Sequence, residues 1–405
     1  MIRARYPESV TTVQLLSRQI DEVLAAELSR LQDRHLERQL QRTGHRRGAL
    51  VETDHGAAVD FSSNDYLGLA SDERLIAAAT KALAEHGVGS GAARLISGNT
   101  PEHEALEFDV AAFFGAERAL TFSSGYAANV GTISALVTRG DAIFADALNH
   151  ASLIDGCRLS RATIHVYPHA DIGALADLLE RHRKEARRAL IVTDGLFSMD
   201  GDIAPLGEIV DLARRSDSWT YVDDAHAVGT LGDDGRGTAS SLGCHGSADV
   251  TVGTLGKAFG TAGAFVYGSA TLIQYLLNRA RSFVFSTAML PAQAAAARAA
   301  LRIVNDEPER PRLLMQNARR LRETLARAGA APQPSDGPII PVAIGDETRT
   351  MRVGAALARA GFLVGAVRPP TVPPGGSRLR ITASAAHTRE QIEGLAGALA
   401  DAMRG

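Results

Sequence analysis

The feature that most restricts the fold of this chain is a regular alternation of apolar runs and amphipathic segments between residues 101 and 267. Short apolar runs predict strands at 118–123, 142–145, 163–167, 189–193, 219–223, 249–253 and 263–267. The segments beside them predict helices at 101–114, 125–138, 150–159, 171–185 and 205–215. Strands that alternate with helices predict an α/β fold, in which a mostly parallel central sheet lies between helices.

Other patterns flank this region and predict a chain of three parts. Apolar residues at three- and four-residue steps predict one long helix or two within 9–42, and weak alternation predicts a hairpin at 50–60. After a helix-rich segment at 291–330, strands are predicted at 338–344, 362–367 and 378–383, and helices at 347–360 and 388–403. We therefore expect an N-terminal helical arm (1–66), a large domain (67–300) and a smaller C-terminal α+β domain (301–405).

The composition is that of an ordinary globular protein. Of the 405 residues, 45% are apolar and 22% are charged, and no apolar run approaches the length of a membrane span. The net charge of -3 gives no reason to expect a nucleic acid or an anionic membrane as partner. Cys157 and Cys244 are too few for a disulfide framework or a zinc cluster, so we expect a cytoplasmic protein without a bound metal.

Lys257 stands in a glycine-rich, otherwise apolar stretch, GTLGKAFG (253–260). Glycines allow a backbone to approach a ligand closely, and apolar surroundings lower the pKa of an ammonium group. This setting suits a lysine that forms a Schiff base with a carbonyl cofactor such as pyridoxal phosphate (PLP). A surface lysine in a loop is the alternative. A nucleotide-binding phosphate loop is not favoured, because the spacing is wrong and Ala258 stands where Ser or Thr is needed.

A second group of polar residues follows the apolar strand 219–223. Asp223, Asp224 and His226 fall at the carboxyl end of this strand, where ligands bind in open α/β sheets. A carboxylate there could keep a pyridine nitrogen protonated, and the histidine could contact the ring oxygen or move a proton. The alternative is a solvated turn in which an aspartate caps the next helix.

Four further stretches carry groups that PLP chemistry needs, although each also has a purely structural interpretation. His150 opens a helix and could stack on an aromatic ring, and Ser198 lies in a polar loop that follows a strand. Ser123-Ser124-Gly125-Tyr126 leads from a strand into a helix, whose first N–H groups could bind a phosphate. Arg378 and Arg380 share one face of a predicted strand, and one of them could bind a carboxylate.

Nine sequence blocks together resemble the α-oxoamine synthases, which are fold-type I PLP-dependent transferases. The blocks are FSSNDYLGLA (61–70), SGNTPEHEALE (97–107), FSSGYAAN (122–129), LNHASLIDG (148–156), VTDGLFSMDGDIAPL (192–206), VDDAHAVG (222–229), GTLGKAFG (253–260), FVFSTAMLP (283–291) and RPPTVPPGGSRLRIT (368–382). The resemblance runs from about residue 20 to the C-terminus. It implies that the large domain binds PLP.

The resemblance also implies roles for individual residues. Lys257 would hold PLP and later act as a general base, with Asp223 on the pyridine nitrogen, His226 on the ring oxygen, His150 stacked on the ring and Ser198 beside it. The phosphate would be bound by Gly125, Tyr126 and Thr254, and also by Thr287 from the partner subunit. Ser286 would likewise act on the site of the other subunit. Arg380 would bind the substrate carboxylate, with Asn64 and Thr371 as further substrate contacts.

Within this family, three stretches most resemble the branch that joins L-alanine to a pimeloyl thioester with loss of CO₂ in biotin biosynthesis. They are SSNDYLGLA, DGLFSMDGDIAPL and GFLVGAVRPPTVPPG. The thioester carrier would be acyl carrier protein or coenzyme A, and the enzyme a homodimer with shared sites. The glycine C-acetyltransferase branch is the alternative within the family. A catalytically inactive scaffold is a third interpretation, but it would be expected to lack Lys257 or Asp223, and both are present.

Overall fold

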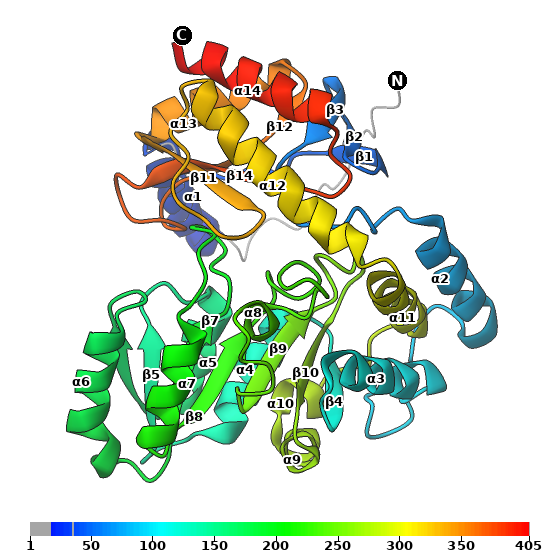
Figure 1. The fold of residues 1–405 in the computed structure, drawn as a ribbon, viewed down its shortest axis with the longest axis vertical. Coiled ribbons are helices and arrows are strands. Elements are labelled where there is room, and N and C mark those ends of the chain that lie inside the picture. The colour runs from blue at the N-terminus through cyan, green and yellow to red at the C-terminus, as the bar shows by residue number, and fades with distance from the viewer. Residues whose placement is uncertain (1–17, 35, 405) are drawn as a thin grey trace.

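The computed structural model describes residues 18–34 and 36–404. These residues form two bodies, shown in Figure 1. The lower body is built on a seven-stranded sheet, and the upper body contains the C-terminal helices together with a four-stranded and a three-stranded sheet. No helix in the described ranges is both long enough and apolar enough to cross a membrane.

The large sheet has the strand order β4-β10-β9-β8-β7-β5-β6. The five strands from β9 to β6 are parallel, and β10 is antiparallel to both of its neighbours. The prediction of a mostly parallel sheet is confirmed, and each predicted strand ends within one residue of the observed one. The strands are β4 (Arg118–Phe122), β5 (Ala142–Asp146), β6 (Thr163–Tyr167), β7 (Ala189–Asp194), β8 (Trp219–Asp223), β9 (Val250–Thr254) and β10 (Ala264–Gly268).

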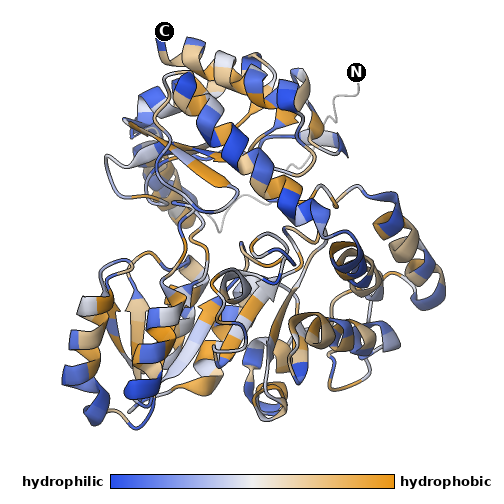
Figure 2. Cartoon of the chain, in the orientation of Figure 1, coloured by the Kyte–Doolittle hydropathy of each residue, from blue (hydrophilic) through white to orange (hydrophobic). Residues whose placement is uncertain are grey.

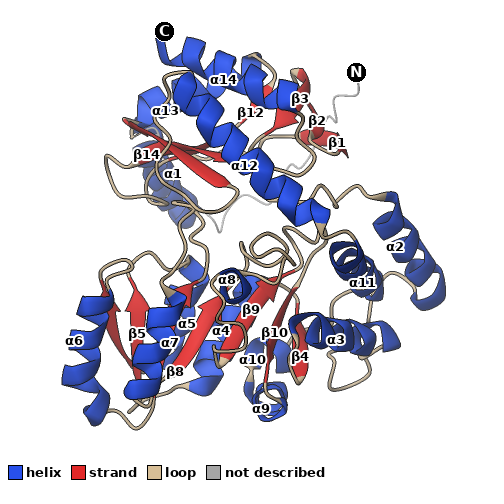
Figure 3. Ribbon diagram, in the orientation of Figure 1, coloured by secondary structure: helices blue, strands red, loops and turns tan. Residues whose placement is uncertain are grey.

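Helices cover both faces of this sheet, because neighbouring residues of a strand point to opposite sides. Ile143 packs in an apolar cluster with α4 and α5, whereas Phe144 packs in another cluster with α6 and α7. Figure 3 shows helices on both sides of the strands, and in Figure 2 the outward sides of α6 and α7 carry many polar residues. The helices of this body include α3 (Pro101–Phe114), α4 (Gly125–Leu136), α5 (Ala151–Ser160), α6 (Ile172–His182), α7 (Leu206–Arg215), α8 (Thr238–Ser241), α9 (Ala270–Arg279) and α10 (Arg281–Val284).

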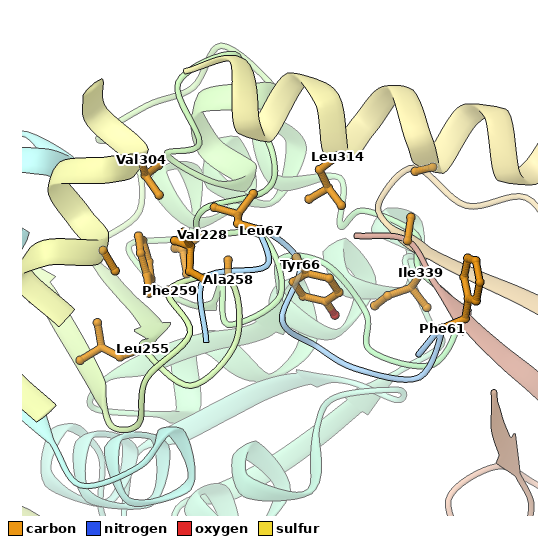
Figure 4. Packing of buried hydrophobic residues seen from close by; sticks show 14 of the residues in the cluster. Phe61, Tyr66, Leu67, Val228, Leu255, Ala258, Phe259, Val304, Leu314 and Ile339 are labelled. Carbon is orange, nitrogen blue, oxygen red and sulfur yellow. The ribbon is translucent and has the colours of Figure 1, made fainter. Parts of the chain in front are cut away.

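The largest apolar cluster joins the two bodies. It extends from Phe259, in the loop that follows β9, through Tyr66 to Leu314 and Ile339 of the upper body (Figure 4). The long helix α12 runs from the lower body into the upper one. A continuous core of this kind fixes the position of the upper body over the carboxyl ends of the parallel strands. The helices at this junction are α2 (Glu73–His86), α11 (Pro291–Asp306) and α12 (Glu309–Arg327).

The upper body contains two sheets, and the predicted strand 362–367 is divided between them. Its first part, β12 (Phe362–Leu363), pairs with β3, whereas its second part, β13 (Gly365–Val367), pairs with β14. The side-chain pattern shows that a segment is extended, but only the partner strands decide which sheet it joins. The remaining elements are β11 (Ile339–Gly345), α13 (Glu347–Arg359), β14 (Ser377–Thr382) and α14 (Arg389–Arg404).

The N-terminal segment contains a helix within the predicted range 9–42 and the hairpin predicted at 50–60, together with one further strand. The helix α1 covers Arg18–Asp33, and residues 9–17 of the predicted helix lie outside the described residues. Three strands follow, β1 (Thr43–Arg47), β2 (Leu50–Thr53) and β3 (Gly56–Asp60), and they join the C-terminal part of the chain through β12. The short, weakly alternating strands of this region gain stability from that pairing, which is not visible in the local sequence.

His387 joins the N-terminal and C-terminal parts of the upper body and is buried. Its ring stacks on Phe61 with centroids 3.9 Å apart, Nδ1 accepts a hydrogen bond from the Ser384 N–H (2.9 Å), and Nε2 donates to the Asp60 carbonyl (3.2 Å). Burial lowers the pKa of His387 to about 4. The imidazole of His387 therefore binds a proton more weakly in the folded protein than in the unfolded chain.

We expect this histidine to make the fold sensitive to mild acid. As the pH falls from about 6.5 toward 4, His387 becomes protonated in the unfolded chain but stays neutral in the folded protein. The free energy of unfolding therefore decreases in that pH range. Between pH 7 and pH 5 the loss due to His387 should be roughly 2 kcal/mol. Urea unfolding at both pH values should show a weaker pH dependence for His387→Gln than for the unchanged protein. An equal dependence would contradict this expectation.

Candidate active site

Lys257 lies in the loop between β9 and β10. The loop is tight, with the Lys257 carbonyl accepting a hydrogen bond from the Gly260 N–H (2.9 Å). Gly260 has φ +65°, and a Cβ atom there would lie 2.5 Å from the Ala70 nitrogen, so this position requires glycine. Burial lowers the pKa of Lys257 to about 8, which makes its neutral, nucleophilic form accessible near neutral pH.

Groups from distant parts of the sequence act electrostatically on Lys257 and on one another. Asp223 and Asp194 raise the pKa of Lys257 against the effect of burial, and Arg380 lowers it further. Burial is the largest cause of the lowered pKa of His226, and Lys257, Arg380 and His150 lower it further. The site is thus assembled from the carboxyl ends of β7 and β8, the loops after β5 and β9, and the strand β14 of the upper body.

Asp223 ends β8 and is buried. Its Oδ2 accepts a hydrogen bond from Asn129 Nδ2 of α4 (2.5 Å), and its Oδ1 accepts one from the Ala225 N–H (3.0 Å). Asn129 also donates to Ser152 Oγ (2.8 Å) and accepts from the Tyr221 hydroxyl (2.8 Å). This network fixes the orientation of the carboxylate. Asn129 closes one of the sequence blocks, but no local pattern marked it as a partner of Asp223.

His226 is held by Tyr66, a residue to which the sequence analysis gave no role. The Tyr66 hydroxyl lies 2.7 Å from His226 Nδ1 and donates to Asn64 Oδ1 (3.1 Å). Figure 4 shows the Tyr66 ring between Ala258 and Ile339, at the boundary between the two bodies. Because burial and the neighbouring cations lower the pKa of His226, this histidine is neutral at neutral pH.

The two arginines of β14 have different partners. Arg380 is buried, and its Nε donates to the Ser198 carbonyl (2.6 Å), while its guanidinium also donates to Asn64 Oδ1 (3.2 Å). Arg378 forms an ion pair with Asp200 and donates to the Gly376 carbonyl (3.1 Å). Only Arg380 joins the cluster around Lys257. For Ser198 it is the carbonyl oxygen that makes this contact.

Asp194 is a second buried carboxylate beside Asp223, and the sequence analysis did not select it. The two residues are register partners at the ends of β7 and β8. Burial, together with the charge of Asp223, raises the pKa of Asp194 well above its usual range. The His150 N–H donates to Asp194 Oδ2 (2.7 Å), and His150 Nδ1 lies 2.7 Å from Ser152 Oγ. His150 is therefore fixed as the N-terminal cap of α5, and the residue is partly exposed.

The predicted phosphate-binding residues lie at the start of α4. Ser124 caps this helix by accepting a hydrogen bond from the Ala127 N–H (3.1 Å), which leaves the N–H groups of Gly125 and Tyr126 without acceptors inside the helix. The Tyr126 ring is half exposed, and its hydroxyl contacts Asp155. Thr254 is buried at the end of β9 and donates to the Gly263 carbonyl (3.0 Å).

Two predicted site residues lie apart from the cluster around Lys257. Thr287 forms an isolated bridge with Ala93 and lines, with Ser123 and Ser286, a cavity of about 20 Å³. Thr371 accepts a hydrogen bond from Arg38 (3.2 Å) beside a cavity of about 720 Å³ between the N-terminal segment and the C-terminal domain. Their predicted contacts with cofactor and substrate stay predictions.

The residues present fit PLP. Lys257 offers an amine of lowered pKa, Asp223 offers a buried and oriented carboxylate for a pyridine nitrogen, and the first turn of α4 offers free N–H groups for a phosphate. His150 is close enough to Asp223 and Lys257, and His226 is close enough to Lys257, for these charges to shift the pKa of each histidine. The donor set therefore matches the three chemical demands of this cofactor.

The chain is similar to known protein families and to individual proteins over most of its length. Residues 57–399 match the family model for aminotransferase class I and II. The 8-amino-7-oxononanoate synthase of Anaeromyxobacter sp. (strain K) is 50% identical over 377 residues, which cover 93% of this chain and 94% of that protein. The 8-amino-7-oxononanoate synthase of Methylococcus capsulatus is 51% identical over 354 residues, covering 87% and 91%.

Solved structures show the same fold. A Sphingomonas wittichii serine palmitoyltransferase has a TM-score of 0.89 at 32% identity, covering 96% of this chain and 98% of that one. A structure of SPT with PLP has a TM-score of 0.90 at 31% identity, covering 96% and 99%. An 8-amino-7-oxononanoate synthase from Francisella tularensis has a TM-score of 0.73 at 29% identity, covering 86% and 98%. The expected fold-type I architecture, family resemblance and PLP cofactor are confirmed.

Proposed function

Because the chain belongs to the aminotransferase class I and II family, we propose that it joins L-alanine to a pimeloyl thioester, releasing CO₂ and the thiol carrier and giving 8-amino-7-oxononanoate. The chain is a PLP-dependent acyltransferase with a role in biotin biosynthesis, as its curated relatives indicate. The choice of alanine and of the pimeloyl group is the proposal. The carrier is acyl carrier protein or coenzyme A.

One observation carries this proposal. The relatives that are about 50% identical over most of the chain carry the name 8-amino-7-oxononanoate synthase, whereas the serine palmitoyltransferases are 31–32% identical. The difference favours the biotin-pathway substrates over serine and a long acyl chain. The glycine-using branch named in the sequence analysis is retained as an outcome of the test.

The residues of the site can perform this reaction. PLP, when bound, supplies an electron-withdrawing ring that stabilises negative charge on the Cα atom of an amino acid. Lys257, with a pKa of about 8, would hold the cofactor through its aldehyde group, and its neutral amine could take the Cα proton of the substrate. Asp223, oriented by Asn129, can hold a proton on the pyridine nitrogen. Arg380, fixed by Ser198 and Asn64, can bind the substrate carboxylate.

A homodimer is part of the proposal. The apolar residues of α1 are 40–61% exposed in the single chain, which suits a helix that packs on a second copy. They are Ile20, Val23, Leu24, Leu28 and Leu31. Ser286 and Thr287 would then complete the partner's site. A cytoplasmic location is also proposed, and it agrees with the two free cysteines, Cys157 and Cys244.

The test is a comparison of amino acids and thioesters. Purified protein is incubated with alanine, glycine or serine, each combined with a pimeloyl, acetyl or palmitoyl thioester, and the product is identified by mass spectrometry. We expect alanine with a pimeloyl thioester to give the highest kcat/KM. Preference for glycine with the acetyl thioester would assign the chain to the alternative branch.

Arg380 and Arg378 provide a matched pair of variants. Lysine cannot reproduce the planar fork of arginine, so Arg380→Lys should raise the KM for alanine by about tenfold to a hundredfold while PLP binding persists. Arg378→Lys should change this KM by less than about threefold, because Arg378 is bound to Asp200. Alanine titrations of both variants measure the difference. A larger effect at position 378 would reverse the assignment.

A further inference from the structure

His169 connects two loops at the carboxyl edge of the large sheet and does not belong to the cluster around Lys257. It lies between β6 and α6, and its Nδ1 is 3.0 Å from Asp146 Oδ1 while its Nε2 is 2.7 Å from Asp202 Oδ2. A carboxylate oxygen only accepts hydrogen bonds, so both ring nitrogens must donate. The ring is therefore an imidazolium between two carboxylates, and these partners raise the pKa of His169 to about 10.

Asp146 is the fixed end of this connection. It ends β5 and is buried, and its two oxygens also accept hydrogen bonds from the N–H groups of Leu148 (2.8 Å) and Ala170 (2.9 Å). Ala170 has φ +54°, which is a costly conformation for a residue with a side chain. The backbone beside His169 is thus held in a strained form by the same carboxylate that holds the ring.

Asp202, the second carboxylate bound to the ring, depends on His169 for its side-chain hydrogen bond. Its Oδ1 is buried without a hydrogen-bond partner in the described part of the chain, so His169 provides the bond that this carboxylate makes. The His169 ring also packs edge-on against Phe197, with centroids 4.4 Å apart. Phe197 in turn donates its N–H to the Asp202 carbonyl (3.0 Å). These contacts hold the 197–202 loop against the end of β5.

The 197–202 loop carries the contact that orients Arg380. The Ser198 carbonyl accepts from Arg380 Nε, and Asp200 of the same loop pairs with Arg378. If His169 were lost, Asp202 would lose its ion pair and would keep a buried Oδ1 without a hydrogen-bond partner in the described residues, so the loop would be expected to move. The Arg380 guanidinium would then lose its fixed direction, since a carbonyl displaced by about 1 Å no longer accepts a well-aligned hydrogen bond.

We propose that His169 is a positioning residue that anchors the 197–202 loop to Asp146 and thereby orients Arg380 toward the carboxylate of the amino-acid substrate. This inference rests on the proposed function for the identity of the substrate. The anchoring itself does not depend on it and can be measured without cofactor or substrate.

The first measurement is hydrogen–deuterium exchange on the cofactor-free protein. His169→Gln is compared with the control variant His182→Gln. His182 ends α6, away from the site, and pairs with Glu185. We expect amide exchange in peptides covering 197–203 to be about tenfold faster in His169→Gln and unchanged in the control. Equal exchange in both variants would overturn the anchoring.

The second measurement is a double-mutant cycle on the alanine KM. We expect His169→Gln to raise this KM about tenfold, with kcat and PLP affinity changed less than about threefold. If His169 acts through Asp202, combining His169→Gln with Asp202→Ala should raise the KM no more than Asp202→Ala alone. Additive effects, or a lower Tm with an unchanged KM, would overturn the proposal. If the unchanged protein makes no product from alanine, the proposed function fails, and the exchange experiment still decides the anchoring.

Discussion

Replacement of Lys257 by alanine is expected to abolish product formation, with kcat reduced by at least about 10⁴-fold. In the proposed roles, Lys257 is both the amine that bonds to the cofactor and the general base, so its loss should have one of the largest effects of any single residue. PLP should still bind through the phosphate and ring contacts, but no covalent bond to the chain should form. Product formation by mass spectrometry and the absorbance spectrum of the bound cofactor measure both effects.

The small number of lysines makes the assignment of the covalent bond unambiguous. The chain contains only Lys81, Lys184 and Lys257, and the first two are exposed. Borohydride reduction of the PLP-loaded protein, followed by peptide mapping, should label Lys257. The control variant Lys184→Ala should keep full activity and the same label. A label on Lys81 or Lys184, or a Lys257→Ala variant that keeps its activity, would contradict the assignment.

Replacement of Asp223 by asparagine is expected to reduce kcat by about 10²- to 10⁴-fold while the protein still binds PLP. An amide oxygen can still accept the hydrogen bond from Asn129, so the local structure should persist. An amide has no charge to keep the pyridine nitrogen protonated, so the ring withdraws electrons less effectively. Steady-state kinetics and PLP titration separate the two effects.

Asp224 is the matched control for this prediction. Its carboxylate lies against Gly195 and Gly237 and accepts the Thr238 N–H (2.9 Å), and burial raises its pKa to about 6. Because this pKa is raised from 3.8, Asp224 lowers stability as the pH rises from about 3.8 to about 6, and the full cost is present above pH 6. Asp224→Asn should therefore alter Tm more than kcat. A large loss of kcat in Asp224→Asn with near-normal turnover in Asp223→Asn would reverse the roles of the two residues.

The pair Asp223–Asp224 shows why only part of the site could be predicted from the local sequence. Two adjacent carboxylates after a strand look equivalent in the sequence, and the family resemblance alone distinguished them. In the structure Asp223 meets Asn129, which lies 94 positions earlier, whereas Asp224 is enclosed by the two glycines. The same applies to Tyr66, which contacts His226 across 160 positions. Contacts between distant segments leave no periodic signal in either segment.

The sequence by itself determined the strands of the large sheet, the alternation that makes most of them parallel, and the position of Lys257 in a glycine-rich loop. These follow from side-chain periodicity and from the conformational freedom of glycine, which are local properties. The tertiary structure alone decided the pairing of β3 with β12, the division of 362–367 between two sheets, the separate partners of Arg378 and Arg380, and the link from His169 to Asp202. Each of these depends on which partner a buried polar group or a strand edge finds. Such partners come from segments that are distant in the sequence, because a buried charge or backbone group needs a hydrogen bond that its neighbours in the chain do not supply.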